Sequence, residues 1–93
     1  DLAVVDCDDS LLYIVPQRID RNAENTNRTL YFRSSCDMDN ATLFVTKGDA
    51  TLYTKRYAHL RPPEMERLRL NLKKDDLSGA SPLLFRLEGT NHA

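Results

Sequence analysis

The residues best suited to chemistry are few and lie far apart in the chain. There are two histidines, His59 and His92, and two cysteines, Cys7 and Cys36. A cysteine nucleophile needs a histidine within hydrogen-bond reach as its base, and no spacing in the sequence indicates such a pair. His59 precedes a proline-containing connection and is expected at the surface, while His92 is next to the last residue, where order is least expected. We therefore predict no catalytic residue.

Oxygen-rich clusters are the next candidates, as metal ligands. Two occur, made of Asp6, Cys7, Asp8 and Asp9 and of Asp37, Asp39 and Asn40. Alternating oxygen ligands suit calcium, but neither cluster has the glycine and distal glutamate of a helix–loop–helix calcium loop. Aspartate and asparagine are common in turns because their side chains bond the local backbone. With no Cys-x-x-Cys spacing and only isolated glycines, we predict no metal-binding and no cofactor-binding residue.

The cysteines and two glycosylation sequons bear on the compartment. Cys7 and Cys36 could form one disulfide, but a secreted domain built on disulfides normally has more cysteines. We therefore favour two free thiols in a cytosolic protein. The sequons, Asn27-Arg28-Thr29 and Asn40-Ala41-Thr42, would accept glycans only in a secreted protein.

Length and charge set the scale of the protein. The chain has 93 residues, enough for one domain with one core. Its formal net charge of −1 gives no reason to expect nucleic acid or an anionic membrane as a partner. The longest apolar runs, such as 11–15, are too short to span a bilayer. Without an initial methionine or a signal peptide, we expect a fragment: residues 1–9 as a linker from an upstream domain, 10–89 as the folded domain and 90–93 as a disordered tail.

Short apolar segments alternate with polar turns along the chain, as is typical of a sandwich or barrel. The pattern predicts six strands, over residues 10–19, 28–35, 41–46, 50–57, 66–73 and 83–88, with loops over 20–27, 34–40 and 74–82. Pro16 removes a backbone donor, so the first segment must be an edge strand or contain a break. The clearest alternation is that of Leu68, Leu70 and Leu72, and it argues against a helix over 64–77.

One-sided strands of this kind pair antiparallel, with one face in solvent and the other in a core. The fold class we predict is all-β, a small antiparallel immunoglobulin-like sandwich of six or seven strands. Tyr31 and Arg33 form one outward row, and Tyr53, Lys55 and Tyr57 form another. Because tyrosine and arginine are enriched at interfaces, Tyr31, Arg33, Tyr53 and Tyr57 are a candidate docking face. The same residues are also normal on a solvated sheet.

Three segments of the chain resemble a known family. They are Tyr13-Ile14-Val15-Pro16-Gln17-Arg18-Ile19, Leu30-Tyr31-Phe32-Arg33 and Pro63-Glu64-Met65-Glu66-Arg67-Leu68-Arg69-Leu70. Through them, over about residues 11–72, the chain resembles the C-terminal domain of bacterial FAD-dependent pyridine nucleotide-disulfide oxidoreductases. In that family a turn usually has proline followed by glycine, where this chain has Pro62-Pro63.

The resemblance implies a cytoplasmic parent enzyme that moves electrons between NAD(P)H, FAD and an acceptor. The nucleotide-binding glycines of such a parent would precede Asp1, so this fragment would hold no cofactor itself. It would be a non-catalytic accessory domain that packs on the flavin domains or on a partner subunit.

Two other interpretations stay open. The sequons, the acidic turns and a bridge between Cys7 and Cys36 would suit an extracellular adhesion or carbohydrate-binding sandwich. A small enzyme that uses His59 with a cysteine is the third hypothesis.

Overall fold

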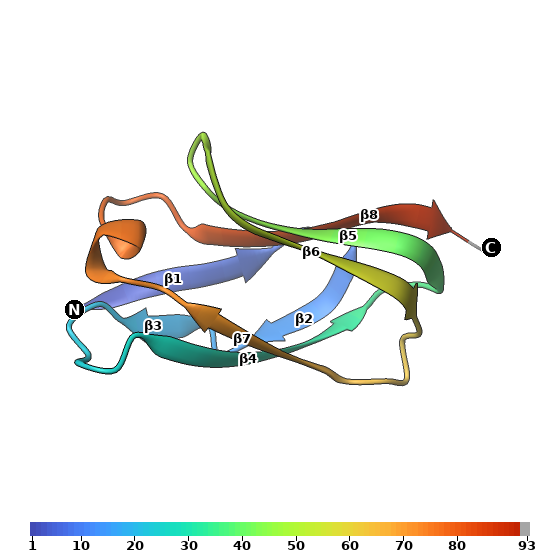
Figure 1. The fold of residues 1–93 in the computed structure, drawn as a ribbon, viewed down its shortest axis with the longest axis horizontal. Coiled ribbons are helices and arrows are strands. Elements are labelled where there is room, and N and C mark those ends of the chain that lie inside the picture. The colour runs from blue at the N-terminus through green and yellow to red at the C-terminus, as the bar shows by residue number, and fades with distance from the viewer. Residues whose placement is uncertain (92–93) are drawn as a thin grey trace.

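Two β-sheets lie face to face in the computed structural model, which describes residues 1–91 (Figure 1). The larger sheet has five strands, in the order β3 (Arg18–Asp20), β1 (Leu2–Cys7), β8 (Leu83–Asn91), β5 (Met38–Lys47) and β6 (Ala50–Leu60). The smaller sheet has three, in the order β2 (Leu11–Val15), β4 (Asn27–Ser34) and β7 (Glu66–Asn71). Strand β1 runs parallel to β8, and the other described pairings are antiparallel.

The core lies between the sheets and is built from alternate residues of the strands. In β4, Leu30 and Phe32 are buried while Thr29 and Tyr31 are exposed, as their alternation predicts. The same alternation in the other long strands buries Ala41, Leu43, Val45, Leu68, Leu70, Leu83, Phe85 and Leu87. Burying one leucine or phenylalanine is worth about 1.5–3 kcal/mol, so this shared layer holds the two sheets together. The predicted all-β, sandwich-like class is confirmed.

The N-terminal segment corrects the expectation of a linker over residues 1–9. This segment forms β1, and its Ala3 and Val5 are buried in the core. Ala3 pairs with Ile19 of β3, and Val5 pairs with Leu83 of β8. The apolar run is only four residues long and is flanked by aspartates, so its alternation is weak in the sequence. Residues 1–91 therefore form eight strands rather than six or seven, and the larger sheet is mixed rather than antiparallel.

The C-terminal strand also extends beyond its predicted end. Strand β8 continues to Asn91, so the expected disordered tail over 90–93 begins as strand. Residues 92 and 93, including His92, lie outside the described residues.

The break predicted at Pro16 is the place where the chain passes from one sheet to the other. Strand β2 ends at Val15 in the smaller sheet, and β3 begins at Arg18 in the larger one. The Val15–Pro16 peptide bond is cis. The Val5 amide donates to the Gln17 carbonyl oxygen at 2.9 Å, which ties this crossing to β1. Proline suits the crossing because it leaves no backbone N–H without a ladder partner.

Strand β5 begins at Met38, inside the loop predicted over 34–40, and is irregular near its start. Asn40 has a φ of 51°, and the register of β5 on β8 shifts between Asp39 and Thr42. Gly89 of β8 faces this irregularity. A Cβ at position 89 would lie 2.9 Å from the Ala41 Cα and 3.0 Å from the Ala41 Cβ, so a side chain has no room there.

One end of the sandwich is closed by the 3₁₀ turn η1 (Lys74–Leu77) and the segment after it. Leu77 is fully buried. Lys47, 9% exposed, donates to the carbonyl oxygens of Ser81 and, at 3.3 Å, Gly79. Arg21 Nε donates to the Leu77 carbonyl oxygen at 2.8 Å. These charge-assisted hydrogen bonds hold a loop that has no strand to pair with. Within residues 1–91, no helix has the length and apolar character that crossing a membrane requires.

Replacing Gly89 by alanine is expected to lower the free energy of unfolding by about 1–3 kcal/mol, because the new methyl group would overlap Ala41. Urea unfolding followed by circular dichroism measures the change. Gly48→Asn is the matched control: Gly48 has a φ of 58°, which asparagine tolerates, and a Cβ there would lie 3.5 Å from Ser81 Oγ. An equal loss in both variants would contradict the close-approach explanation.

Candidate functional site

The outer face of the smaller sheet gathers tyrosine, arginine and exposed apolar side chains. Strand pairing sets them in rows: Val15 of β2 lies beside Tyr31 of β4, and Tyr31 lies beside Arg67 of β7. Tyr13 and Arg33 form a neighbouring row. Val15 is 40% exposed and Tyr31 is 37% exposed, so an apolar strip continues across two strands. We call these five residues the arginine–tyrosine face.

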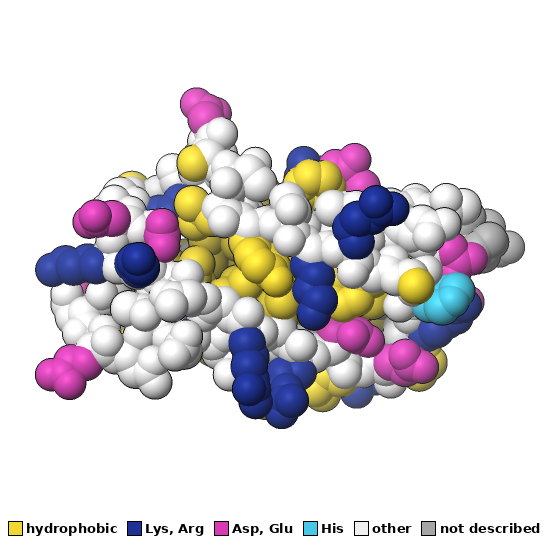
Figure 2. Space-filling view, viewed as in Figure 1, with side chains coloured by type: hydrophobic (Ala, Val, Ile, Leu, Met, Phe, Trp, Pro, Cys, Tyr) yellow, Lys and Arg dark blue, Asp and Glu magenta, His cyan; other side chains and the backbone are white. Residues whose placement is uncertain are grey.

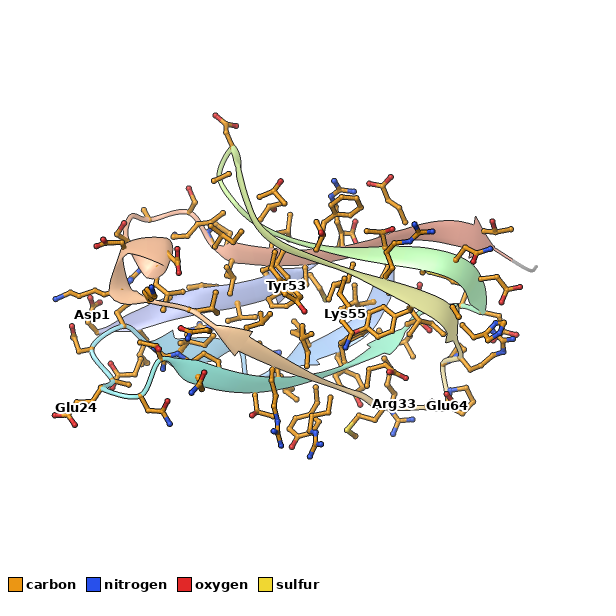
Figure 3. The ribbon with its side chains drawn as sticks, viewed as in Figure 1. Asp1, Glu24, Arg33, Tyr53, Lys55 and Glu64 are labelled. Atoms are coloured by element: carbon orange, nitrogen blue, oxygen red, sulfur yellow. The ribbon has the colours of Figure 1, made fainter. Side chains whose placement is uncertain are left out.

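Arg33 is held in place within this face. Its Nε donates to the Tyr13 Oη at 2.7 Å, and its Nη1 donates to the Pro63 carbonyl oxygen at 2.9 Å. The guanidinium carbon lies 5.9 Å from the centre of the Tyr13 ring. Figure 3 shows Arg33 at the end of the sheet, beside Glu64 of the connection between β6 and β7. Fixed side chains lose little conformational entropy when a partner binds.

The charge on this face is of one sign. The outward positions of β4 and β7 hold Arg33, Arg67 and Arg69 and no aspartate or glutamate. Glu66 of β7 pairs with the buried Phe32 and so belongs to the inward side. The whole chain has a formal net charge of −1, so its acidic residues concentrate elsewhere.

A shallow polar depression of about 560 Å³ continues the face toward one end of the sheet. Its lining includes the polar residues Asn25, Asn27, Thr29, Arg69 and Asn71. The Asn27 amide donates to the Asn25 Oδ1 at 3.0 Å, which fixes the loop that borders the depression. The depression therefore offers amide, hydroxyl and guanidinium groups, and no carboxylate.

The structure places the four predicted docking residues in two separate locations. Tyr31 and Arg33 belong to the arginine–tyrosine face, whereas Tyr53 and Tyr57 lie on the inward side of β6, opposite buried residues of β5. Tyr57 packs edge-on against Phe32, with ring centres 5.9 Å apart. Figure 3 shows Tyr53 and Lys55 between β6 and β7. These tyrosines therefore border the opening between the two sheets rather than a common outer face.

The surroundings of Tyr57 disfavour its ionised form. Burial, followed by the charge of Glu66 and the neighbouring Tyr53, raises the pKa of Tyr57 well above its ordinary range. Its Oη is buried and has no hydrogen-bond partner among the described residues. The Lys55 Nζ lies 5.1 Å from the centre of the Tyr57 ring, so the cation rests on the ring face.

The catalytic candidates belong to different parts of the fold: Cys7 ends β1, Cys36 lies between β4 and β5, and His59 lies in β6. His59 Nδ1 is 2.8 Å from the Asp39 Oδ1, on an exposed part of β6, and Asp39 also lies 3.5 Å from an Arg61 nitrogen. Cys7 and Cys36 are both free and partly buried, as the preferred interpretation expected. Among residues 1–91, no group of three or more histidine, cysteine or acidic side chains is placed to hold a metal ion.

Comparison with protein families, curated proteins and solved structures gives no match to this chain.

Strand pairing adds residues that the sequence alone did not assign to the face. Tyr13 and Val15 join it because β2 pairs with β4, and Arg67 joins it because β7 lies on the other side of β4. Arg67 and Arg69 alternate with buried leucines, which marked them as outward. The alternation does not say which strand is the neighbour, so the rows could not be assembled beforehand.

Cys7 is expected to react more slowly with iodoacetamide in the folded protein than in the unfolded chain. Burial, and then the charges of Asp6, Asp8 and Asp9, raise the pKa of Cys7, so less thiolate is present at any pH below it. The measurement uses a Cys36→Ser variant at about pH 8, with and without urea. Equal rates in the two states would contradict the effect of burial, because the neighbouring aspartates stay beside Cys7 in the unfolded chain.

Tyr57→Phe is expected to remove part of the alkaline loss of stability. Because the folded state favours the neutral phenol, its contribution is present below the unfolded pKa of about 10 and is lost as the pH rises above it. Urea unfolding between about pH 9 and about pH 11 should show a shallower decline for the variant. Tyr31→Phe, which removes an exposed phenol, is the control and should follow the wild type. Identical slopes for all three proteins would contradict the prediction.

Proposed function

We propose that this chain is a non-catalytic docking domain that binds a larger protein through its arginine–tyrosine face. The observation that carries the proposal is the row Val15–Tyr31–Arg67, an exposed apolar and aromatic strip bordered by arginines. Tyrosine and arginine dominate the residues that contribute most to protein interfaces. The bond between Arg33 and Tyr13 supports the proposal because it orders part of the face in advance.

The sandwich is, in this proposal, immunoglobulin-like in build. Strands β2 and β4 belong to one sheet, β5 and β6 to the other, β7 returns to the first and β8 to the second. An immunoglobulin sandwich likewise divides its strands between two sheets, and its chain crosses between them several times. Strands β1 and β3 extend the larger sheet beyond β8.

The resemblance noted in the sequence supports a particular host for the domain. We propose that the host is a cytoplasmic FAD-dependent pyridine nucleotide-disulfide oxidoreductase. The domain would pack on its flavin domains or on a partner subunit, and other domains would bind FAD and NAD(P). Two of the resembling segments, 13–19 and 30–33, supply Tyr13, Val15, Tyr31 and Arg33 of the face. Two free cysteines suit a reducing compartment.

An extracellular adhesion or carbohydrate-binding domain is the second candidate. The observation in its favour is that Asn27 and Asn40, the acceptors of both sequons, are exposed. Glycans at these positions would project into solvent. The free cysteines favour the first candidate instead, because a bridge was part of the argument for secretion.

The test of the proposed host uses the purified chain of 93 residues. It should show no flavin absorbance after incubation with FAD, and no reduction of a dye by NADH. When mixed with the flavin domains of an enzyme from the resembled family that lacks its own C-terminal domain, it should associate in sedimentation velocity. Tyr31→Asp should abolish the association, while Thr54→Asp, on the outer side of β6, should not.

Each result has a defined meaning for the proposal. Bound FAD or dye reduction by the isolated chain would overturn the non-catalytic role. Absence of association would overturn the proposal that the host is a flavin enzyme. Association that survives Tyr31→Asp would show that the docking site is not the arginine–tyrosine face.

A further inference from the structure

The two sheets end in four edge strands, and three of them carry features that hinder pairing with another chain. Strand β3 has only three residues. Strand β2 is irregular between Leu11 and Tyr13 and is followed by Pro16. Strand β6 has a register shift, and its Lys55 lies on the inward side opposite the buried Leu43. Short length, bulges, prolines and inward-pointing charges are the usual means of blocking strand addition at a sheet edge.

Strand β7 is the fourth edge, and it has no bulge or proline; its one inward charge, Glu66, stands at its first residue. Its six residues pair with β4 without any register shift. It contains no proline, and its inward Leu68 and Leu70 are buried. No strand within residues 1–91 lies beside its outer edge, so backbone donors and acceptors there are available to an extended segment.

Two arginines give this edge a charge preference. Arg67 and Arg69 point to the outer face and are exposed. No hydrogen bond or ion pair joins either side chain to another described residue. In a strand, side chains two residues apart lie about 7 Å apart on one face. An added strand with acidic residues at alternate positions would place a carboxylate beside each arginine.

The same arginines disfavour a second copy of this chain as the added strand. Antiparallel pairing of β7 with β7 would bring the arginines of the two copies alongside each other. Like charges on neighbouring strands are destabilising, whereas opposite charges stabilise. The occupant must therefore be acidic on the side that faces outward.

The inward side of an added strand would meet a mainly apolar surface that also carries the charges of Lys55 and Glu66. Figure 2 shows hydrophobic side chains at the surface along the opening between β6 and β7. Leu52, Tyr53 and Tyr57 of β6 are partly buried and pack against the core from this side. Apolar residues at the alternate positions of the added strand would contact them and cover the opening.

We propose that the β7 edge binds an extended acidic protein segment in which aspartate or glutamate alternates with apolar residues. The segment adds to β7 as a ninth strand of the molecule, with its carboxylates beside Arg67 and Arg69 and its apolar side chains over the opening between the sheets. The inference rests on the proposed docking role, and it names the chemistry of the partner and the way it binds.

The test uses a fluorescent peptide of about ten residues that alternates glutamate and valine. Fluorescence anisotropy should show binding that weakens severalfold when salt rises from about 0.05 M to about 0.5 M. R67E/R69E should weaken binding by at least about tenfold. The matched control is R56E, which reverses an exposed arginine of β6 in the other sheet and should leave the affinity within about twofold. R67Q/R69Q, which removes the charges without reversing them, covers the case in which the reversal variant does not fold.

Two control ligands decide between strand addition and general attraction. A peptide of the same composition with its glutamates and valines in separate blocks should bind at least about tenfold more weakly, since it cannot match both sides of β7. Bound alternating peptide should also slow hydrogen exchange of β7 amides. Equal binding of the block peptide, unchanged exchange in β7, or tighter binding of an oligothymidylate of equal charge would overturn the inference. Because flavin binding and sedimentation test the proposed host separately, failure here leaves that result standing.

Discussion

The parallel pairing of β1 with β8 is the contact on which the rest of the architecture depends. It brings Ala3 and Val5 over the core, and it gives β3 a neighbour, since Ala3 pairs with Ile19. With β3 anchored in the larger sheet, the chain crosses at Pro16 and leaves β2 in the smaller sheet. Only then does β2 lie beside β4, where Tyr13 reaches the guanidinium of Arg33. The outer face that we propose for docking thus rests on a strand that contributes nothing to that face itself.

The strands that the sequence predicted well are those whose alternation is long and uninterrupted. The leucines of β7 and the apolar residues of β5 could be assigned to the core because a period of two leaves only one face for them. Strand β1 could not be predicted in this way, since its apolar run is short and its partners lie far along the chain. Parallel pairing also has no local signal, because it joins segments that no tight turn connects.

The candidate site shows the same division between local and non-local information. Alternation indicated that Tyr31 and Arg33 point outward, and the structure agrees, with Tyr31 exposed and Arg33 partly exposed. Alternation placed Tyr53 and Tyr57 on one side of β6, but whether that side meets solvent or core depends on the opposite sheet. Phe32 of the opposite sheet packs on Tyr57, so Tyr53 and Tyr57 border the opening between the two sheets. A contact between sheets of this kind has no trace in the sequence of either strand alone.

The direction of β1 and β8 also has a mechanical consequence. Both strands run the same way along the long axis, so the start of β1 and the end of β8 lie at opposite ends of the molecule (Figure 1). Tension applied between these ends would pull β1 and β8 past each other in shear, loading their backbone hydrogen bonds together rather than one after another. A sandwich closed by an antiparallel terminal pair would instead peel open from one end. Strand β1, which brings Ala3 and Val5 into the core, is therefore also placed to resist extension of the molecule.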